Sequence, residues 1–240
     1  MLFPQSEGDL RESHTMLFAF DCDGVLVDSE IIAAEVDSRL LSEAGFKISP
    51  AEVTQRFAGL TSGAIHDIVE KEIGRSLPPD FMERQREQLD SRLARDLKAV
   101  PGVEALLDKI EGPRCICSNS SSERLTIELN KVKLIDRFRP YIFSAVEVGD
   151  RQPKPAPNVY AYAAREFGVD PREMVVLEDS IFGVAAAKAA GARVIGFTGG
   201  RHTWLGHADL LIDAGAETVI HRFDDFPAIA AALMAWEGME

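Results

Sequence analysis

The sequence predicts an α/β protein with a doubly wound, Rossmann-like parallel sheet and an inserted α-helical cap. Three observations carry this prediction. Short runs that are apolar throughout recur along the chain, helical patterns separate them from about residue 100 onward, and the segment 30–98 contains helical patterns only. Runs that are apolar on both faces are typical of parallel strands covered by helices on both sides. The 240 residues suit one domain that carries a smaller inserted one.

Five runs are expected to form the strands, and polar or small residues follow four of them. Their lengths of four or five residues are ordinary for strands and too short for buried helices. The predicted strands are Leu17–Phe20, Arg114–Cys117, Tyr141–Ala145, Met174–Leu177 and Arg193–Phe197.

Helical patterns alternate with these strands in the second half of the chain. Ser120-Ser-Ser-Glu123 is typical of a capping box, so we expect Ser120 to cap the helix that follows. Glycines after two of the patterns favour helix ends there. The predicted helices of this half are Pro101–Ile110, Ser120–Leu129, Asn158–Phe167 and Gly183–Ala190.

The segment 30–98 has amphipathic helical stretches and no convincing strand. A helical block of this length is too long for an ordinary connection between two strands. We therefore predict a helical cap domain over residues 30–98, a core domain formed by residues 16–29 and 99–240, and a polar N-terminal tail over residues 1–15. The predicted cap helices are Ile31–Ala44, Pro50–Phe57, Ala64–Ile73 and Asp80–Leu97.

The charge balance excludes some classes of function. With 26 basic and 39 acidic residues, the net charge is −13. Such a surface repels nucleic acids and anionic lipids, so we expect neither as a partner. The longest apolar run, Phe226–Trp236, is too short for a membrane span. The first fifteen residues lack a secretory signal, and the three cysteines contain no C-x-x-C pair, so we expect a cytoplasmic protein. We also expect a monomer or a weak homodimer.

Polar residues stand at the carboxyl ends of the predicted strands, which is where open α/β sheets bind their ligands. Taken singly, an acidic pair after a strand is more often a helix cap or a solvated turn, and a lysine is more often at the surface. Their common position at one edge of one sheet favours a site. The candidate site residues are Asp21, Asp23, Ser118, Asn119, Lys154, Glu178 and Asp179.

These residue types suit phosphate chemistry. Carboxylates gathered at one place repel each other unless a divalent cation lies between them, and all-oxygen donors favour Mg²⁺. Lys154 adds a positive charge for a phosphate oxygen or for Asp21, and Ser118 offers a hydroxyl. A carboxylate beside Mg²⁺ and a bound phosphate can attack phosphorus and form an aspartyl phosphate. Asp23 can protonate the leaving oxygen and then deprotonate the hydrolytic water.

Four segments also match known motifs in order: D-x-D-G with D-S at residues 21–29, Ser118-Asn119, Lys154 in Lys-Pro-Ala-Pro157, and Glu178-Asp179-Ser180. In these motifs the chain resembles the haloacid dehalogenase superfamily of phosphatases, over residues 16–236. The branch with a helical cap includes phosphoglycolate phosphatases and β-phosphoglucomutases. The resemblance implies these roles: nucleophile and metal ligand for Asp21, acid/base and metal ligand for Asp23, phosphate binding for Ser118, Asn119 and Lys154, and metal binding for Asp179 and Glu178.

Phosphatases and phosphomutases of this kind share the four motifs, so the cap must separate them. Mutases that resemble this branch carry a histidine twelve residues after the nucleophile, where this chain has Ala33. They also carry an arginine in the cap loop, whereas the corresponding residues 59–63 of this chain contain no arginine. We therefore predict hydrolysis, with a β-phosphoglucomutase-like sugar phosphomutase as the alternative. A receiver-like signalling module that accepts phosphate is an alternative of another class, but it would need neither the helical insertion nor Asp23.

The expected partner is a small phosphomonoester. Thr61 and Ser62, between two cap helices, are candidates to contact its hydroxyl groups, although a simple helix–helix turn explains them equally well. The first segment of the cap has few basic residues, which favours a sugar or polyol phosphate over a substrate with a second strong negative charge. The histidines lack metal-ligand spacing and are expected at the surface or at helix ends; they include His66, His202, His207 and His221.

Overall fold

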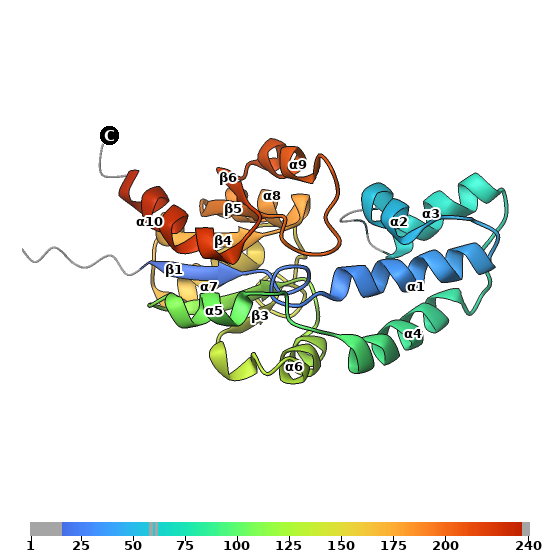
Figure 1. Ribbon diagram of the computed structural model, residues 1–240, viewed down its shortest axis with the longest axis horizontal. Coiled ribbons are helices and arrows are strands. Elements are labelled where there is room, and N and C mark those ends of the chain that lie inside the picture. The colour runs from blue at the N-terminus through green and yellow to red at the C-terminus, as the bar shows by residue number, and fades with distance from the viewer. Residues whose placement is uncertain (1–15, 58–59, 61, 237–240) are drawn as a thin grey trace, which may run out of the picture.

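The core of the protein is a six-stranded parallel sheet with the strand order β3-β2-β1-β4-β5-β6 (Figure 1). The computed structural model describes residues 16–57, 60 and 62–236, so the predicted tail and Thr61 lie outside the described residues. This order is that of a doubly wound Rossmann-like sheet, and the predicted fold class is confirmed. The strands are β1 Leu17–Phe20, β2 Arg114–Ser118, β3 Ile142–Ser144, β4 Met174–Glu178, β5 Arg193–Phe197 and β6 Thr218–Ile220.

The five predicted strands are all present, with ends that differ by one residue at most. Strand β6 was not predicted. It has only three residues and pairs only with β5, at the edge of the sheet. A short edge strand lacks the continuous apolar run that marks the strands buried on both faces.

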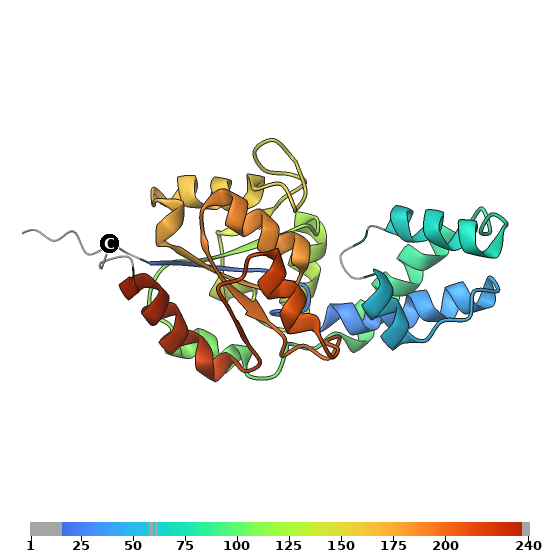
Figure 2. The ribbon, with the colours of Figure 1, turned by 90° about the horizontal axis from the view of Figure 1, so that it is seen from above.

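Alternation along β1 sends side chains into two separate cores. Phe18 and Phe20 enter the core on one face, whereas Leu17 and Ala19 enter the core on the other. Figure 2 shows helices on both sides of the sheet. The first face is covered by α5 (Val103–Lys109), α6 (Ser122–Lys131) and α10 (Phe226–Trp236), and the second by α7 (Asn158–Phe167), α8 (Ile181–Ala190) and α9 (His207–Ala214).

Four further helices lie beside the sheet, on the right of Figure 1. They enclose an apolar cluster of their own, which includes Leu40, Val69 and Phe81. The domain boundaries at residues 30 and 98 stay a prediction. These helices are α1 Ser29–Glu43, α2 Pro50–Phe57, α3 Ser62–Ile73 and α4 Phe81–Asp96.

The two chain segments that connect this helical block with the sheet pair with each other. The Asp28 amide donates to the Lys98 carbonyl at 2.9 Å, and the Val100 amide donates to the Leu26 carbonyl at 3.0 Å. Both segments therefore leave the sheet at the same place, beyond the carboxyl end of β1. None of the helices in the described parts of the chain is long and apolar enough to cross a membrane.

Phe226 attaches α10 to the sheet, and its removal tests the first core. Its fully buried ring lies 5.7 Å from that of Phe18 and 5.6 Å from that of Phe20, between centroids. We expect Phe226→Ala to lower the free energy of unfolding by about 3–5 kcal/mol, because it leaves a cavity. Urea denaturation measures this. As the control, Leu205→Ala removes a fully exposed side chain and should change it by less than about 0.5 kcal/mol; similar losses in both variants would contradict the packing described.

Candidate active site

The strand order places the candidate site residues at one edge of the sheet. Strands β2, β1 and β4 are neighbours and parallel, so the residues that follow them meet at their common carboxyl ends. Asp21 follows β1, Ser118 ends β2, and Asp179 follows β4. All three are buried. This edge faces the helical block α1–α4 (Figure 1).

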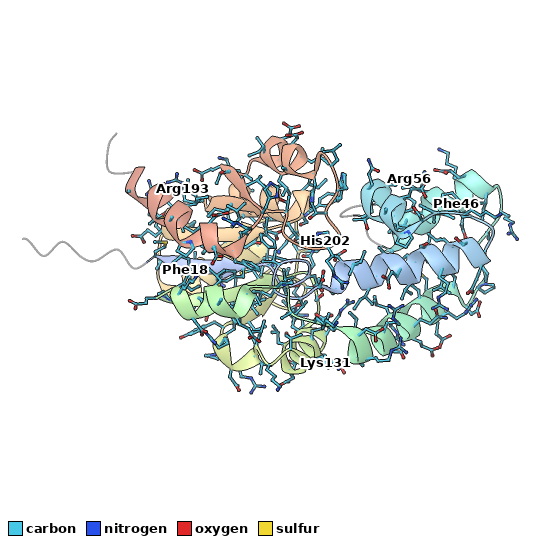
Figure 3. All side chains as sticks on the ribbon, in the orientation of Figure 1. Phe18, Phe46, Arg56, Lys131, Arg193 and His202 are labelled. Atoms are coloured by element: carbon cyan, nitrogen blue, oxygen red, sulfur yellow. The ribbon has the colours of Figure 1, made fainter. Side chains whose placement is uncertain are left out.

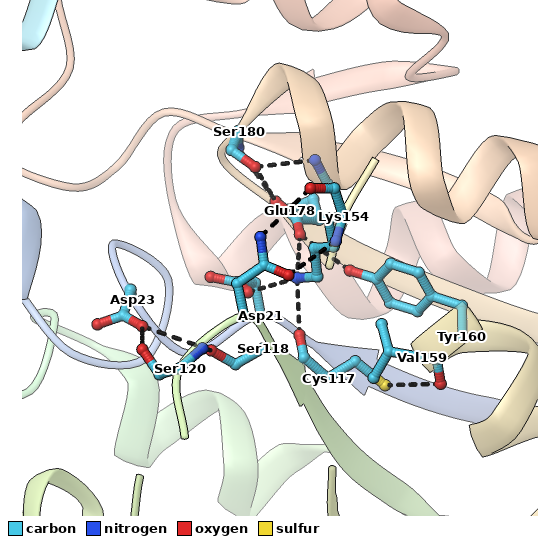
Figure 4. A network of polar contacts seen from close by, with 12 residues as sticks. Asp21, Asp23, Cys117, Ser118, Ser120, Lys154, Val159, Tyr160, Glu178 and Ser180 are labelled. Atoms are coloured by element: carbon cyan, nitrogen blue, oxygen red, sulfur yellow. Dashed lines mark hydrogen bonds and ion pairs between the residues drawn. The ribbon is translucent and has the colours of Figure 1, made fainter. Parts of the chain in front are cut away.

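The buried Lys154 lies at the centre of the site (Figure 4). Its Nζ donates to Asp21 Oδ1 at 2.5 Å, to Glu178 Oε1 at 2.5 Å and to the Cys117 carbonyl at 2.7 Å. An ammonium group has three N–H donors, so all of them are used. Burial by itself would lower the pKa of Lys154, but the two carboxylates outweigh it and raise that pKa. Lys154 is therefore a fixed positive charge.

Asn119 holds the backbone of this lysine. Its Oδ1 accepts a hydrogen bond from the Lys154 amide at 2.8 Å, and its Nδ2 donates to the Lys154 carbonyl at 3.4 Å. Both polar atoms of the side chain thus contact the lysine backbone. The structure brings Asn119 into the site as a support for Lys154, whereas its predicted contact with phosphate stays a prediction.

Glu178 is fully buried and accepts hydrogen bonds from all sides. Besides Lys154, the Tyr160 hydroxyl donates to Oε1 at 2.9 Å, and the amide and hydroxyl of Ser180 both donate to Oε2 at 3.1 Å. The space beside this carboxylate exists only because residue 183 is a glycine: a Cβ there would lie 1.8 Å from Glu178 Oε1. The Glu178 carboxylate is therefore fixed in one orientation.

Three carboxylates surround one ammonium group. Ligand atoms of Asp21, Glu178 and Asp179 lie within 4.8 Å of one another. When all are ionised, Lys154 leaves two negative charges uncompensated. Burial raises the pKa of Asp21 well above its usual value, and the neighbouring acids add to this although Lys154 opposes it. Burial likewise raises the pKa of Asp179. An all-oxygen donor set with this charge fits a hard divalent cation such as Mg²⁺.

Asp23 is half-buried and bound by three serines. Ser29 donates to its Oδ1 at 2.6 Å, whereas Ser120 and Ser118 donate to its Oδ2 at 2.8 and 3.4 Å. The prediction that Ser120 caps the next helix is wrong by one residue. Ser121 caps α6 by accepting from the Arg124 amide, which leaves Ser120 free to bind Asp23.

The expectation for the histidines is wrong at His202, which is buried in the loop after β5, whereas His207 is buried but begins helix α9, as expected of a helix-end histidine. His202 Nε2 lies 2.9 Å from Asp179 Oδ2, and His207 Nε2 lies 2.8 Å from the Asp179 carbonyl. Their position after β5, at the same sheet edge, was the available signal. Ser62 begins α3 and is half-buried, with no part in these contacts; its contact with substrate stays a prediction.

Comparison with known proteins agrees with this geometry. Residues 18–197 match the haloacid dehalogenase-like hydrolase family. The chain belongs to this family. The 6-phosphogluconate phosphatase of Escherichia coli (strain K12) is 31% identical over 184 residues, which cover 76% of this chain and 82% of that protein. The family resemblance predicted from the four motifs is confirmed.

Solved structures of the haloacid dehalogenase-like family extend the match to nearly the whole chain. A conserved haloacid dehalogenase-like protein of unknown function from Agrobacterium tumefaciens is 52% identical, with a TM-score of 0.88 over 91% of this chain and 99% of that one. A hydrolase from Deinococcus radiodurans, solved with bound phosphate and sodium, is 29% identical, with a TM-score of 0.80 over 92% of this chain and 97% of that one.

The contact between Gly183 and Glu178 can be tested by stability alone. We expect Gly183→Ala to lower the free energy of unfolding by about 1–3 kcal/mol, because the new methyl group overlaps the Glu178 carboxylate. In a Glu178→Ala background the overlap is gone, and alanine should instead stabilise α8 by up to about 1 kcal/mol. Urea denaturation of the four proteins gives both values. An equal cost of Gly183→Ala in the two backgrounds would show that the carboxylate is not the obstacle.

Proposed function

We propose that the protein is a Mg²⁺-dependent phosphatase that hydrolyses a small phosphomonoester through an aspartyl phosphate on Asp21. The observation that carries this proposal is the buried Asp21 carboxylate, paired with Lys154 and within 4.8 Å of Asp179. The 6-phosphogluconate phosphatase of E. coli, one of several relatives named as phosphatases, and the phosphate bound in the structure from Deinococcus radiodurans support it.

The reaction follows from the positions of two aspartates. An Asp21 carboxylate oxygen attacks phosphorus, the bond from phosphorus to the ester oxygen breaks, and Asp23 gives its proton to that oxygen. Water then attacks the phosphorus of the aspartyl phosphate while Asp23 takes up its proton, which releases inorganic phosphate and restores Asp21. Lys154 and the Ser118 hydroxyl stabilise the charge on the phosphoryl oxygens.

A metal fits this scheme through the donor set of the site. Asp21 and Asp179 would hold it by their carboxylates, with Glu178 close by. The resemblance to the family adds the backbone carbonyl of Asp23 as a further ligand. Bound Mg²⁺ would neutralise the carboxylates and the phosphate so that two anions can approach each other. The seryl donors to Asp23 keep the acid/base turned toward the same edge of the sheet.

Asp21→Asn tests the proposed nucleophile. We expect this variant to lose phosphatase activity by about a thousandfold or more, because an amide is a poor nucleophile. p-Nitrophenyl phosphate is the substrate, and the activity should require Mg²⁺ and disappear with EDTA. Asp150→Asn, which changes an exposed acid of the same domain, should leave the rate unchanged.

Two results of this experiment would contradict the proposed reaction. Cleavage by Asp21→Asn at the parental rate would exclude Asp21 as the nucleophile. A phosphorylated aspartate that persists without release of phosphate, detected after acid quenching, would instead indicate the receiver-like switch.

We further propose a sugar or polyol phosphate as the substrate. The E. coli relative is named for 6-phosphogluconate, which has a polyol chain. Helix α1, the first of the helical block, has one basic residue, Arg39, whose guanidinium is already bound to Gln88. This helix therefore offers little positive charge to a second anionic group. The cytoplasmic location and the monomer or weak homodimer stay predictions.

A substrate panel with product analysis tests this choice. Glucitol 6-phosphate and 6-phosphogluconate differ only at one end, by a hydroxymethyl and a carboxylate group. We expect kcat/KM for glucitol 6-phosphate to be at least equal to that for 6-phosphogluconate. For phosphoglycolate we expect kcat/KM to be about tenfold lower, because its carboxylate places a second negative charge close to the phosphate. β-Glucose 1-phosphate should give glucose and free phosphate. A preference for phosphoglycolate would refute the substrate class, and glucose 6-phosphate as product would establish a mutase.

A further inference from the structure

His202 contacts a proposed metal ligand from outside the four motifs. It lies in the loop between β5 and α9, on the side of the core that faces the helical block (Figure 3). Its Nε2 is 2.9 Å from Asp179 Oδ2, and the two side chains are only 6% and 5% exposed. Among the described residues, its Nδ1 is buried without a hydrogen-bond partner.

Two glycines make room for this contact. A Cβ at Gly200 would lie 2.6 Å from His202 Cε1 and 2.7 Å from its Nδ1. A Cβ at Gly24, in the turn after Asp23, would lie 1.9 Å from Asp179 Oδ2 and 2.8 Å from His202 Cε1. The imidazole and the carboxylate therefore occupy a space that any larger residue at these two positions would close.

A second histidine holds the same aspartate by its backbone. His207 Nε2 lies 2.8 Å from the Asp179 carbonyl, and the Trp204 ring stacks on His207 with 4.1 Å between centroids. Asp179 is thus fixed at both its carbonyl and its carboxylate. When one oxygen of a carboxylate accepts a hydrogen bond, the group no longer rotates freely, and its other oxygen points in a fixed direction.

We propose that His202 is a positioning residue for metal binding: its Nε2–H donates to Asp179 Oδ2 and thereby presents the other oxygen of Asp179 to the metal. This inference rests on the Mg²⁺ site of the proposed function. His202 itself is not one of the described residues that gather as possible ligands, which are Asp21, Glu178 and Asp179. Donors of this kind change metal affinity by about tenfold to a hundredfold when they are removed.

Calorimetric titration of Mg²⁺ into the protein without substrate tests the inference. His202→Phe keeps a ring of similar size but removes the donor, and we expect about tenfold weaker Mg²⁺ binding or more. His202→Gln places an amide donor near the position of Nε2 and should recover most of the affinity. At saturating Mg²⁺, the kcat of His202→Phe should approach that of the parent with little change in KM. His66→Gln, in α3, is the control and should bind Mg²⁺ like the parent.

Each outcome is decisive. Parental Mg²⁺ affinity in His202→Phe would overturn the inference, and so would equal losses in the phenylalanine and glutamine variants, because the donor would then not matter. Should His202→Phe not fold, His202→Asn replaces it, since its shorter amide does not reach Asp179. If the parent protein binds no Mg²⁺, the proposed metal site fails as well, which separates that failure from a failure of His202 alone.

Discussion

The structure of the site depends on the burial of three carboxylates around one ammonium group. Charges removed from water are tolerated in a protein only when they are paired and their hydrogen bonds are satisfied. Lys154 meets this condition with all three of its N–H donors, and Glu178 with four accepted hydrogen bonds. Three neighbouring residues help to meet this condition. Asn119 holds the backbone of Lys154, Tyr160 donates a hydrogen bond to Glu178, and Gly183 leaves space for the Glu178 carboxylate.

The same constraint gives the carboxylates different roles. Glu178 has its oxygens occupied by protein donors, so it acts as the permanent counter-charge of Lys154. Asp21 accepts from Lys154 at one oxygen, and Asp179 from His202 at one oxygen. Each of these two keeps an oxygen for another partner, which makes them better candidates for direct metal contact than Glu178. In the acidic pair at residues 178 and 179, the first residue thus serves the buried lysine, and the second is the candidate metal ligand.

Much of the candidate site could be predicted from the sequence, because most of its residues directly follow the ends of strands. Apolar runs located β1, β2 and β4, and parallel strands necessarily bring the residues after them to one edge. The contacts of Tyr160 and Ser120 could not be predicted in this way, and for His202 the end of β5 indicates the edge of the sheet but not the contact with Asp179. Each contact depends on the direction of a side chain, which the end of a strand does not determine. For Ser120, a shift of the cap by one residue changes the function of the side chain.

The connection between the sheet and the helical block adds a mechanical constraint to the electrostatic one. The two connecting segments pair through the amides of Asp28 and Val100, which holds them together as one short joint. Ser29, the first residue of α1, donates to the Asp23 carboxylate, and Arg201 pairs with the Asp28 carboxylate on the other side. The first residue of α1 is therefore linked by a hydrogen bond to the proposed acid/base, so a shift of this helix would also move a donor of Asp23. Because Arg201 precedes His202, the loop after β5 contacts both the joint and a metal-ligand candidate. The contacts that anchor the helical block to the sheet and the contacts that hold the proposed acid/base therefore involve the same few residues.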